Sequence, residues 1–398
     1  MLSLKTIAAS YTLSAKLDPE KCEKLIESLG IRRSTILDYV YPNNIKLSAA
    51  HLRLTPYKDI KSFIEDCCRL IDMAIQSGSQ LLLLPHLLGL VPLSVDKPSM
   101  SLATSLIEDI HKGQTPPANL RTRFELVMDK LSDFLFDCYY NIFLLLAHKY
   151  NIYIAAGSTY VATSQGIFCR SYLFSPDSDE AFFQDKISLN PTERALGIQP
   201  GNELKIFDSK IGKLAILTDT DGLFYECYKA AKALGAQLVL TPALGSEQLS
   251  HNPRYNASLM NAQHYNLYSV RSSFYSTGET LPVFRGASGI YAPLLMTRDL
   301  NGVVVHNHES DETGGVLSSR IDPPRLLDNM DVYSHHRNPL FYERMMKETY
   351  PGFFKGTLPS PTVVPSYVPQ AKEEEAKAPP QETAEEASAA SQENTAQA

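Results

Sequence analysis

The 398-residue sequence lacks any apolar run of the ~18 residues that a transmembrane helix requires, so we expect no membrane span. The N-terminal stretch MLSLKTIAASYTLSAKLDPEKCEK has no sustained apolar segment followed by a cleavage site, which argues against a secretory signal. Basic residues are not in excess either, since 37 Lys and Arg stand against 44 Asp and Glu, and no basic stripe favours nucleic-acid binding. These absences predict a cytoplasmic protein without membrane or nucleic-acid partners.

Cysteines are few, scattered and mostly placed in apolar segments. None of them shows the Cys-x-x-Cys spacing of a zinc or redox motif. The six positions are Cys22, Cys67, Cys68, Cys138, Cys169 and Cys227. We therefore expect reduced thiols, no disulfide framework, no metal and no cofactor.

Charge of one sign gathers only at the C-terminal end. Residues 359–398 hold two lysines and seven glutamates, and this net −5 leaves −2 of the total −7 for the rest of the chain. The segment is rich in Pro, Ala, Glu, Gln and Ser and has almost nothing to pack, so we predict a disordered acidic low-complexity tail. Before it we predict an N-terminal extension over 1–43, a main domain over 44–325 and a C-terminal extension over 326–358.

The main domain alternates between strand and helix patterns. Residues 44–54 predict a strand, residues 57–78 an amphipathic helix, and residues 79–90 a strand whose continuous apolar run suits a sheet covered on both faces. Residues 121–151 are helical in pattern, and we expect them to form two segments against the core; residues 258–270 predict a further helix. This alternation predicts an α/β domain with a sheet core and outer helices.

The chain contains no Gly-rich phosphate loop and no Gly-x-Ser-x-Gly elbow. It contains instead, in this order, the stretches GSQLLLLPHLLGL, QDKISLNPTE, IQPGNELKIFDSKIGKLAILTDTDGLFYE, GAQLVLTPAL and FRGASGIYAP. Together they resemble the carbon–nitrogen hydrolase (nitrilase) superfamily over roughly residues 44–325. The resemblance implies a four-layer αββα sandwich that assembles into a homodimer or larger homo-oligomer through a helical face.

The catalytic positions depart from this family's pattern. The family triad is Glu, Lys and Cys: the thiol attacks a nitrile or amide carbon, the glutamate carries the proton, and the lysine stabilises the oxyanion. By resemblance, Lys186 stands at the lysine position. His86, directly after Pro85, stands where the glutamate is expected, and Asp219 stands at the cysteine. Cys227 is the nearest cysteine in sequence, but it lies beyond the turn, in a predicted helix.

Three further residues belong to the predicted site as ligand-contacting groups. Glu193 stands where the family commonly has a second acidic residue, and we expect it either to orient Lys186 and line the pocket or to be a solvated loop residue. Thr220 and Asp221 follow Asp219 in the turn, and Asp221 matches an aspartate of the family pattern. These residues define a candidate binding site for a small molecule.

Three functions remain open, because a carboxylate is a far weaker nucleophile than a thiolate at an amide carbon. The first is a noncatalytic or altered protein whose pocket binds a small amide- or carboxylate-type metabolite. The second is an active amidase-like hydrolase with Asp219 as nucleophile or base, Lys186 as oxyanion stabiliser and His86 as proton carrier. The third is a structural or assembly protein in which Lys186 and Asp219 form only a structural ion pair.

Two other features bear on the site. His86, Asp219 and Asp221 carry donor atoms that suit a metal ion, but the neighbouring Lys186 argues against one. The helical insertion over 100–135 is expected to cover or narrow the entrance to the pocket.

Overall fold

The computed structural model describes residues 12–101, 103, 117–245, 251–277, 285–308, 311–334 and 338–349. The predicted acidic tail over 359–398 and the middle of the predicted insertion lie outside the described residues. Within the described part of the chain, no helix is long and apolar enough to span a membrane.

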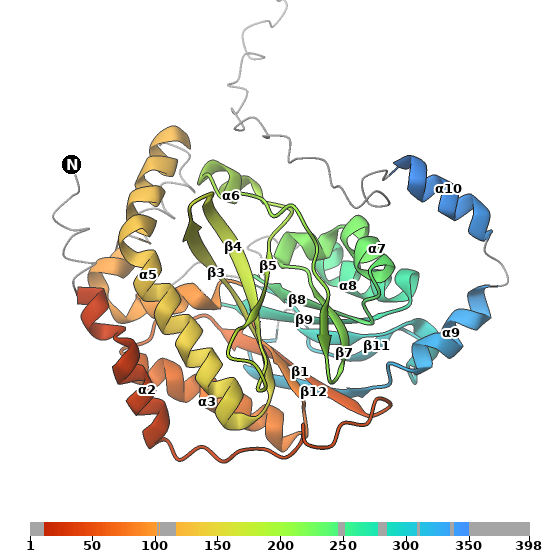
Figure 1. Cartoon of the computed structure of the whole chain (residues 1–398), viewed down its shortest axis with the longest axis horizontal. Coiled ribbons are helices and arrows are strands. Elements are labelled where there is room, and N and C mark those ends of the chain that lie inside the picture. Colours follow the sequence, from red (N-terminus) through yellow and green to blue (C-terminus); the bar gives the residue numbers. More distant parts are fainter. Residues whose placement is uncertain are drawn as a thin grey trace, which may run out of the picture.

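The main chain folds into strands flanked by helices (Figure 1). The strands are β1 (Ile45–Arg53), β2 (Leu81–Leu83), β3 (Tyr153–Thr163), β4 (Gly166–Phe174), β5 (Phe182–Asp185), β6 (Phe207–Ser209), β7 (Gly212–Ile216), β8 (Leu238–Ala243), β9 (Tyr268–Tyr275), β10 (Gly289–Tyr291), β11 (Val303–His306) and β12 (Gly315–Ile321). The α-helices are α2 (Pro19–Ser28), α3 (Ile60–Gln76), α5 (Pro117–Tyr150), α6 (Pro191–Ala195), α7 (Tyr225–Ala233), α8 (His251–Tyr265), α9 (Arg325–Ser334) and α10 (Pro339–Thr349). Short 3-10 helices are η1 (Leu88–Val95), η2 (Asp219–Leu223) and η3 (Leu294–Met296).

The twelve strands pair in one continuous sheet that folds back on itself, and its two halves are called the two sheets below. One runs in the order β5-β4-β3-β2-β1-β12, and the other contains β6-β7-β8-β9-β10-β11. The two sheets meet where the end of β1 pairs in parallel with the end of β9, at His51–Arg53 and Ser273–Tyr275. In each sheet the central strands are parallel: β1, β2 and β3 in the first, and β7, β8 and β9 in the second.

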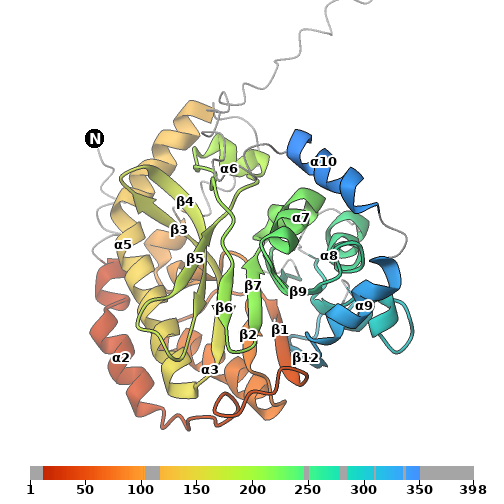
Figure 2. The ribbon, with the colours of Figure 1, turned by 45° about the vertical axis from the view of Figure 1, so that its right-hand side comes forward.

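The sheets pack face to face, and helices cover their outer faces. Leu81 and Leu83 of β2 point into a core shared with Leu214 of β7 and Leu238 of β8, whereas Leu82 points the other way, into the core beneath the helices α2, α3 and α5. This alternation follows from the two-residue period of a strand. On the far side, α7 and α8 cover the second sheet, and Figure 2 shows the helical layers on opposite sides of the strands. The predicted four-layer αββα sandwich is confirmed.

The helix α5 corrects the prediction of two segments over 121–151. It is one continuous helix of 34 residues. Its buried residues recur every three or four positions, at Leu131, Leu135, Cys138, Ile142 and Leu146, which is the spacing of a single helical stripe. No proline or glycine interrupts this stripe, so nothing in the sequence requires a break.

Two other predicted elements have bounds that differ from those expected: the strand is shorter, and the helix begins earlier, at His251. The predicted strand over 79–90 pairs only at Leu81–Leu83, because Pro85 has no N–H for the ladder and the chain turns at Leu87, whose φ is 59°. The predicted helix over 258–270 ends at Tyr265, and its last residues belong to β9.

Candidate functional site

The candidate site forms where strands from both sheets end. His86 follows β2 of the first sheet, Lys186 follows β5 of the same sheet, and Asp219 follows β7 of the second sheet. All three are buried, with 1%, 0% and 6% of the residue exposed. The sandwich therefore brings together residues that are 100 and 33 positions apart in the chain.

Lys186 lies between two carboxylates. Its Nζ donates to Glu193 Oε1 at 2.8 Å and to Asp219 Oδ2 at 3.3 Å. Burial alone would lower the pKa of Lys186, but the charges of Asp219 and Glu193 outweigh burial and raise this pKa above its ordinary value. The lysine is therefore a permanent cation in the site.

Glu193 is held in place by the local structure of α6. Asn190 caps this helix: its side chain accepts from the backbone N–H of Glu193, and Glu193 Oε2 accepts from the backbone N–H of Asn190 at 2.8 Å. This reciprocal capping box leaves Oε1 for Lys186. Burial raises the pKa of Glu193, and Lys186 offsets this only in part. Glu193 is thus buried against Lys186 and is not a solvated loop residue, while its contact with a ligand remains a prediction.

The first turns of α5 cover the loop that carries Lys186 and Glu193. Leu120, Phe124 and Met128 on α5 pack in one buried cluster with Leu189 and Leu196. This part of the predicted insertion therefore packs against the lysine loop, and its effect on an entrance to the pocket remains a prediction.

His86 belongs to a hydrogen-bond chain on the other side of Glu193. Its Nδ1 lies 2.7 Å from Ser158 Oγ, and its Nε2 lies 3.9 Å from Glu193 Oε1. Ser158 Oγ also accepts from the backbone N–H of Leu87 and from the thiol of Cys169. With two donors already directed at it, the hydroxyl gives its own hydrogen to Nδ1. The network therefore assigns the neutral tautomer to His86, with a hydrogen on Nε2 facing Glu193.

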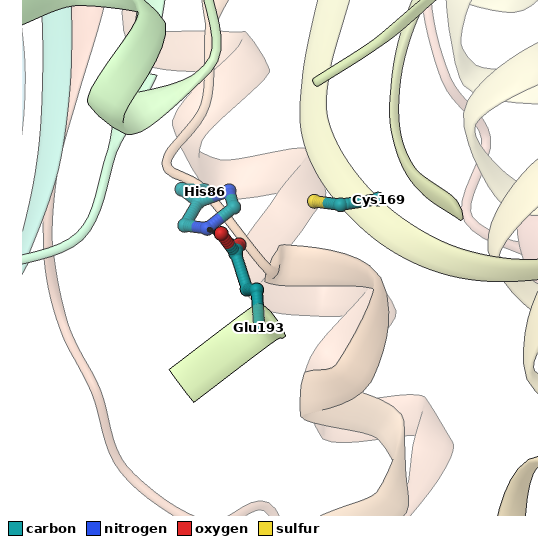
Figure 3. Close-up of side chains that lie close together, drawn as sticks. All are labelled: His86, Cys169 and Glu193. Atoms are coloured by element: carbon teal, nitrogen blue, oxygen red, sulfur yellow. Dashed lines mark ion pairs between the residues drawn. The ribbon is translucent and has the colours of Figure 1, made fainter. Parts of the chain in front are cut away.

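Cys169 is a site residue that the sequence did not reveal. It lies on β4, and His86, Cys169 and Glu193 each offer a ligand atom within 4.8 Å of the other two (Figure 3). The alternation of β4 indicates that Cys169 faces one side of the sheet, but it does not indicate which side. Only the folded sheet shows that this side carries the site.

The donor set at Cys169 fits a hydrogen-bond network better than a metal centre. Burial and the charge of Glu193 raise the pKa of Cys169 above its ordinary value, so the group stays a thiol. Lys186 already occupies Glu193 Oε1 at 2.8 Å, where a cation would have to bind. Cys227 also stays a thiol, because burial and the charge of Asp221 raise its pKa to about 12.

Asp219 sits in an unusual backbone conformation at the start of η2. Its φ is 48°, in the left-handed region that few residues other than glycine adopt, although aspartate tolerates it better than most. Its Oδ1 accepts from the backbone N–H of Leu244 at 3.3 Å, after the end of β8, and Oδ2 faces Lys186. Both oxygens are therefore engaged, and the turn directs the carboxylate at the lysine.

Thr220 and Asp221 anchor the lysine loop to this turn. Asp221 accepts from the backbone N–H groups of Ile187, at 3.0 Å, and Ser188, while the Thr220 hydroxyl donates to the carbonyl of Ser188. Asp221 is completely buried, and burial raises its pKa from 3.8 to about 6 despite these two donors. Both side chains thus join the turn to the lysine loop. Their contacts with a ligand remain predictions.

We expect the carboxyl group of Asp221 to make the free energy of unfolding depend on pH. The pKa of Asp221 is higher in the folded chain than its ordinary value, so the folded state binds more protons between pH 4 and 6, and stability from this group falls as the pH rises through that range. A difference of roughly 2 pKa units corresponds to about 3 kcal/mol. In Asp221→Asn this contribution is missing. The free energy of unfolding of the wild type minus that of the variant should therefore fall by about 3 kcal/mol between pH 4 and pH 7. Urea unfolding at several pH values measures the difference, and one that is constant or rises with pH would contradict the assignment.

Comparison with known proteins gives two sequence matches. A family model for carbon–nitrogen hydrolase matches residues 140–323. A "Probable hydrolase YhcX" from Bacillus subtilis (strain 168) is 30% identical over 172 residues, which is 42% of this chain and 33% of that protein. The chain thus spans about a third of the length of the curated relative it matches.

Two solved structures share the fold. Nit3 of Saccharomyces cerevisiae, described as a member of branch 10 of the nitrilase superfamily, superposes with a TM-score of 0.51 at 17% identity, covering 73% of this chain and 94% of that one. The NitFhit protein of C. elegans superposes with a TM-score of 0.54 at 15% identity, covering 74% of this chain and 65% of that one. At these identities the likeness concerns the fold alone.

Proposed function

Because this chain belongs to the carbon–nitrogen hydrolase superfamily, we propose that it keeps the family's pocket for binding a small amide- or carboxylate-type metabolite without hydrolysing it. One observation carries this proposal. Lys186, the residue at the oxyanion-stabilising position, is bound by two carboxylates, and one of them is Asp219 at the position of the nucleophile.

This arrangement disfavours amide hydrolysis for two reasons. A carboxylate that attacks an amide carbon has to expel an amine while forming a mixed anhydride, which readily reverts. Asp219 is also stabilised as an anion by Lys186, which lowers its reactivity further. In turn, a lysine whose charge is already matched by Asp219 and Glu193 stabilises a developing oxyanion poorly.

No thiol of the site replaces the missing nucleophile. Cys169 is fully buried and donates to Ser158, and its raised pKa keeps it protonated. Cys227 lies in α7, and its pKa is raised as well. Both lack the depressed pKa that a catalytic cysteine needs.

Ligand binding is supported by the remaining hydrogen-bonding capacity of the site. The ammonium group of Lys186 has three hydrogens, and two of them are directed at Glu193 and Asp219. The third is suited to the carbonyl oxygen of a ligand that enters past Asp219, the most exposed of the three side chains. One cation faces two carboxylates here, so a neutral amide is favoured over a carboxylate.

One observation favours the alternative, an active hydrolase that uses Asp219, Lys186 and His86. The left-handed backbone of Asp219 is strained by about 1 kcal/mol or more, and strain of this kind gathers at active sites. A structural role and assembly as a homo-oligomer are further proposals; exposed apolar side chains on the outer helices, such as Tyr225 on α7 and Met260 on α8, support assembly.

The test measures binding and turnover on the same full-length protein. The compounds are a panel of small amides, nitriles and carbamoyl compounds, studied by calorimetry and by ammonia release. We expect saturable heats of binding for neutral amides without release of ammonia. Ammonia release that disappears in Asp219→Ala would favour the hydrolase instead. An absence of saturable binding across the panel would favour the structural role.

A further inference from the structure

A separate cavity of about 220 Å³ opens beside the line where the two sheets join. Its lining combines apolar side chains with two arginines and one aspartate. The residues are Leu52, Arg53, Leu54, Thr55, Tyr57, Asp66, Arg69, Leu88, Val91, Phe274, Tyr275, Gly314 and Gly315. A cavity of roughly 150 Å³ holds a benzene molecule, so this one admits a ligand somewhat larger than benzene.

The cavity is distinct from the Lys186 site. It lies at the carboxyl ends of β1 and β9, between the helix α3 and the 3-10 helix η1. Leu88, at the start of η1, is the lining residue nearest in sequence to His86. None of the residues that contact Lys186 lines this cavity.

Asp66 and Arg53 each bind a neighbouring hydroxyl group. Asp66 Oδ2 accepts from the Tyr57 hydroxyl at 2.7 Å, and Arg53 Nη2 donates to Thr277 Oγ1 at 2.8 Å. Arg69 donates through Nε and Nη2 to Asp66 Oδ1, at 2.9 and 2.8 Å. The Nη1 of Arg69 has only the thioether of Met73 at 3.5 Å, which is a weak acceptor.

The guanidinium group of Arg69 is thus placed to bind an anion. Its side chain is 54% exposed, so it connects the cavity with solvent, while Asp66 holds its guanidinium plane in one orientation. Guanidinium groups bind carboxylates through charge-assisted hydrogen bonds. The apolar side chains Leu52, Val91 and Phe274 provide a dry surface for the rest of such a ligand.

We propose that this cavity is a second binding site, which takes a small monocarboxylate with its apolar part inside and its carboxylate at Arg69. The proposal is independent of what the Lys186 site binds.

The experiment titrates benzoate and its neutral isostere nitrobenzene, which is not an amide, into the full-length protein and measures the dissociation constants by calorimetry. The same titrations are made on Arg69→Gln and on Arg121→Gln. Arg121 is the matched control, since its Nε binds Glu125 at 2.8 Å with a side chain that is 53% exposed. We expect the wild type to bind benzoate at least tenfold more tightly than nitrobenzene. Arg69→Gln should weaken benzoate binding at least tenfold, and Arg121→Gln should leave it unchanged.

A third variant tests the position of the apolar part. Val91→Phe places a larger side chain in the cavity and should abolish benzoate binding. Circular dichroism checks its fold, and Arg69→Gln decides the question if this variant does not fold. The proposal is overturned if benzoate does not bind, if nitrobenzene binds as tightly as benzoate, or if Arg69→Gln binds benzoate as the wild type does.

Discussion

Lys186→Met should destabilise the protein by about 3–5 kcal/mol, because it leaves the carboxylates of Glu193 and Asp219 buried without their cation. The expected loss is the largest of any single charge removal in the site. Urea unfolding of the full-length protein at pH 7 measures it. Lys186→Met combined with Asp219→Asn should recover part of the loss, since one unpaired buried charge is then removed as well.

Lys210→Met provides the matched control. Lys210 Nζ lies 2.8 Å from Asp177 Oδ2, the same distance that separates Lys186 from Glu193, but both side chains are about half exposed. Surface pairs of this kind contribute at most about 1 kcal/mol. If the two lysine variants lost similar amounts of stability, the site would be solvated and the account of a buried ion-pair cluster would be wrong.

Gly157→Ala should cost more than about 3 kcal/mol, through a direct backbone collision. Gly157 has a φ of 70°, and a Cβ there would lie 1.8 Å from the carbonyl oxygen of Pro85. The peptide that must move connects Pro85 to His86, and the residue after Gly157 is Ser158, the hydrogen-bond partner of His86. The substitution therefore disturbs both ends of the histidine network.

Gly30→Ala separates this collision from simple backbone strain. Gly30 has a φ of 61°, close to that of Gly157, but a Cβ there meets nothing within 4 Å. Only the left-handed conformation is penalised, by about 1–2 kcal/mol. Urea unfolding compares the two variants. Equal losses would show that the contact with Pro85 is not decisive.

The sequence predicted the alternation of strands and helices well because burial patterns report it directly, whereas the four-layer arrangement was implied by the family resemblance. Strand-period and helix-period apolar segments alternate along the chain, and the predicted strand over 44–54 and helix over 57–78 correspond to β1 and α3. The failures are local. An apolar run cannot show where strand pairing stops, so the predicted strand over 79–90 was too long. The helical pattern over 121–151 contains no helix breaker, and the prediction of two segments there was wrong because α5 is continuous.

The site was predicted in part. The order of motifs placed Lys186, Asp219 and Asp221 in one cluster, and their contacts with each other's loops are present. The contribution of Cys169 and Ser158 was missed, because strand alternation does not reveal which face of β3 and β4 meets His86. Such a contact depends on how the two sheets pack, and this is a property of the whole fold rather than of any local pattern.

The central claim is that a carboxylate bound to Lys186 has replaced the hydrolytic nucleophile. Ammonia release by the wild type, Asp219→Ala and Asp219→Cys, from the same panel of amides, nitriles and carbamoyl compounds, tests it most directly. The account predicts no release by the wild type or Asp219→Ala. Release by Asp219→Cys would show in addition that only the nucleophile is missing from a pocket that still recognises an amide. Release by the wild type that is lost in Asp219→Ala would contradict the account, because Asp219 would then carry the chemistry itself.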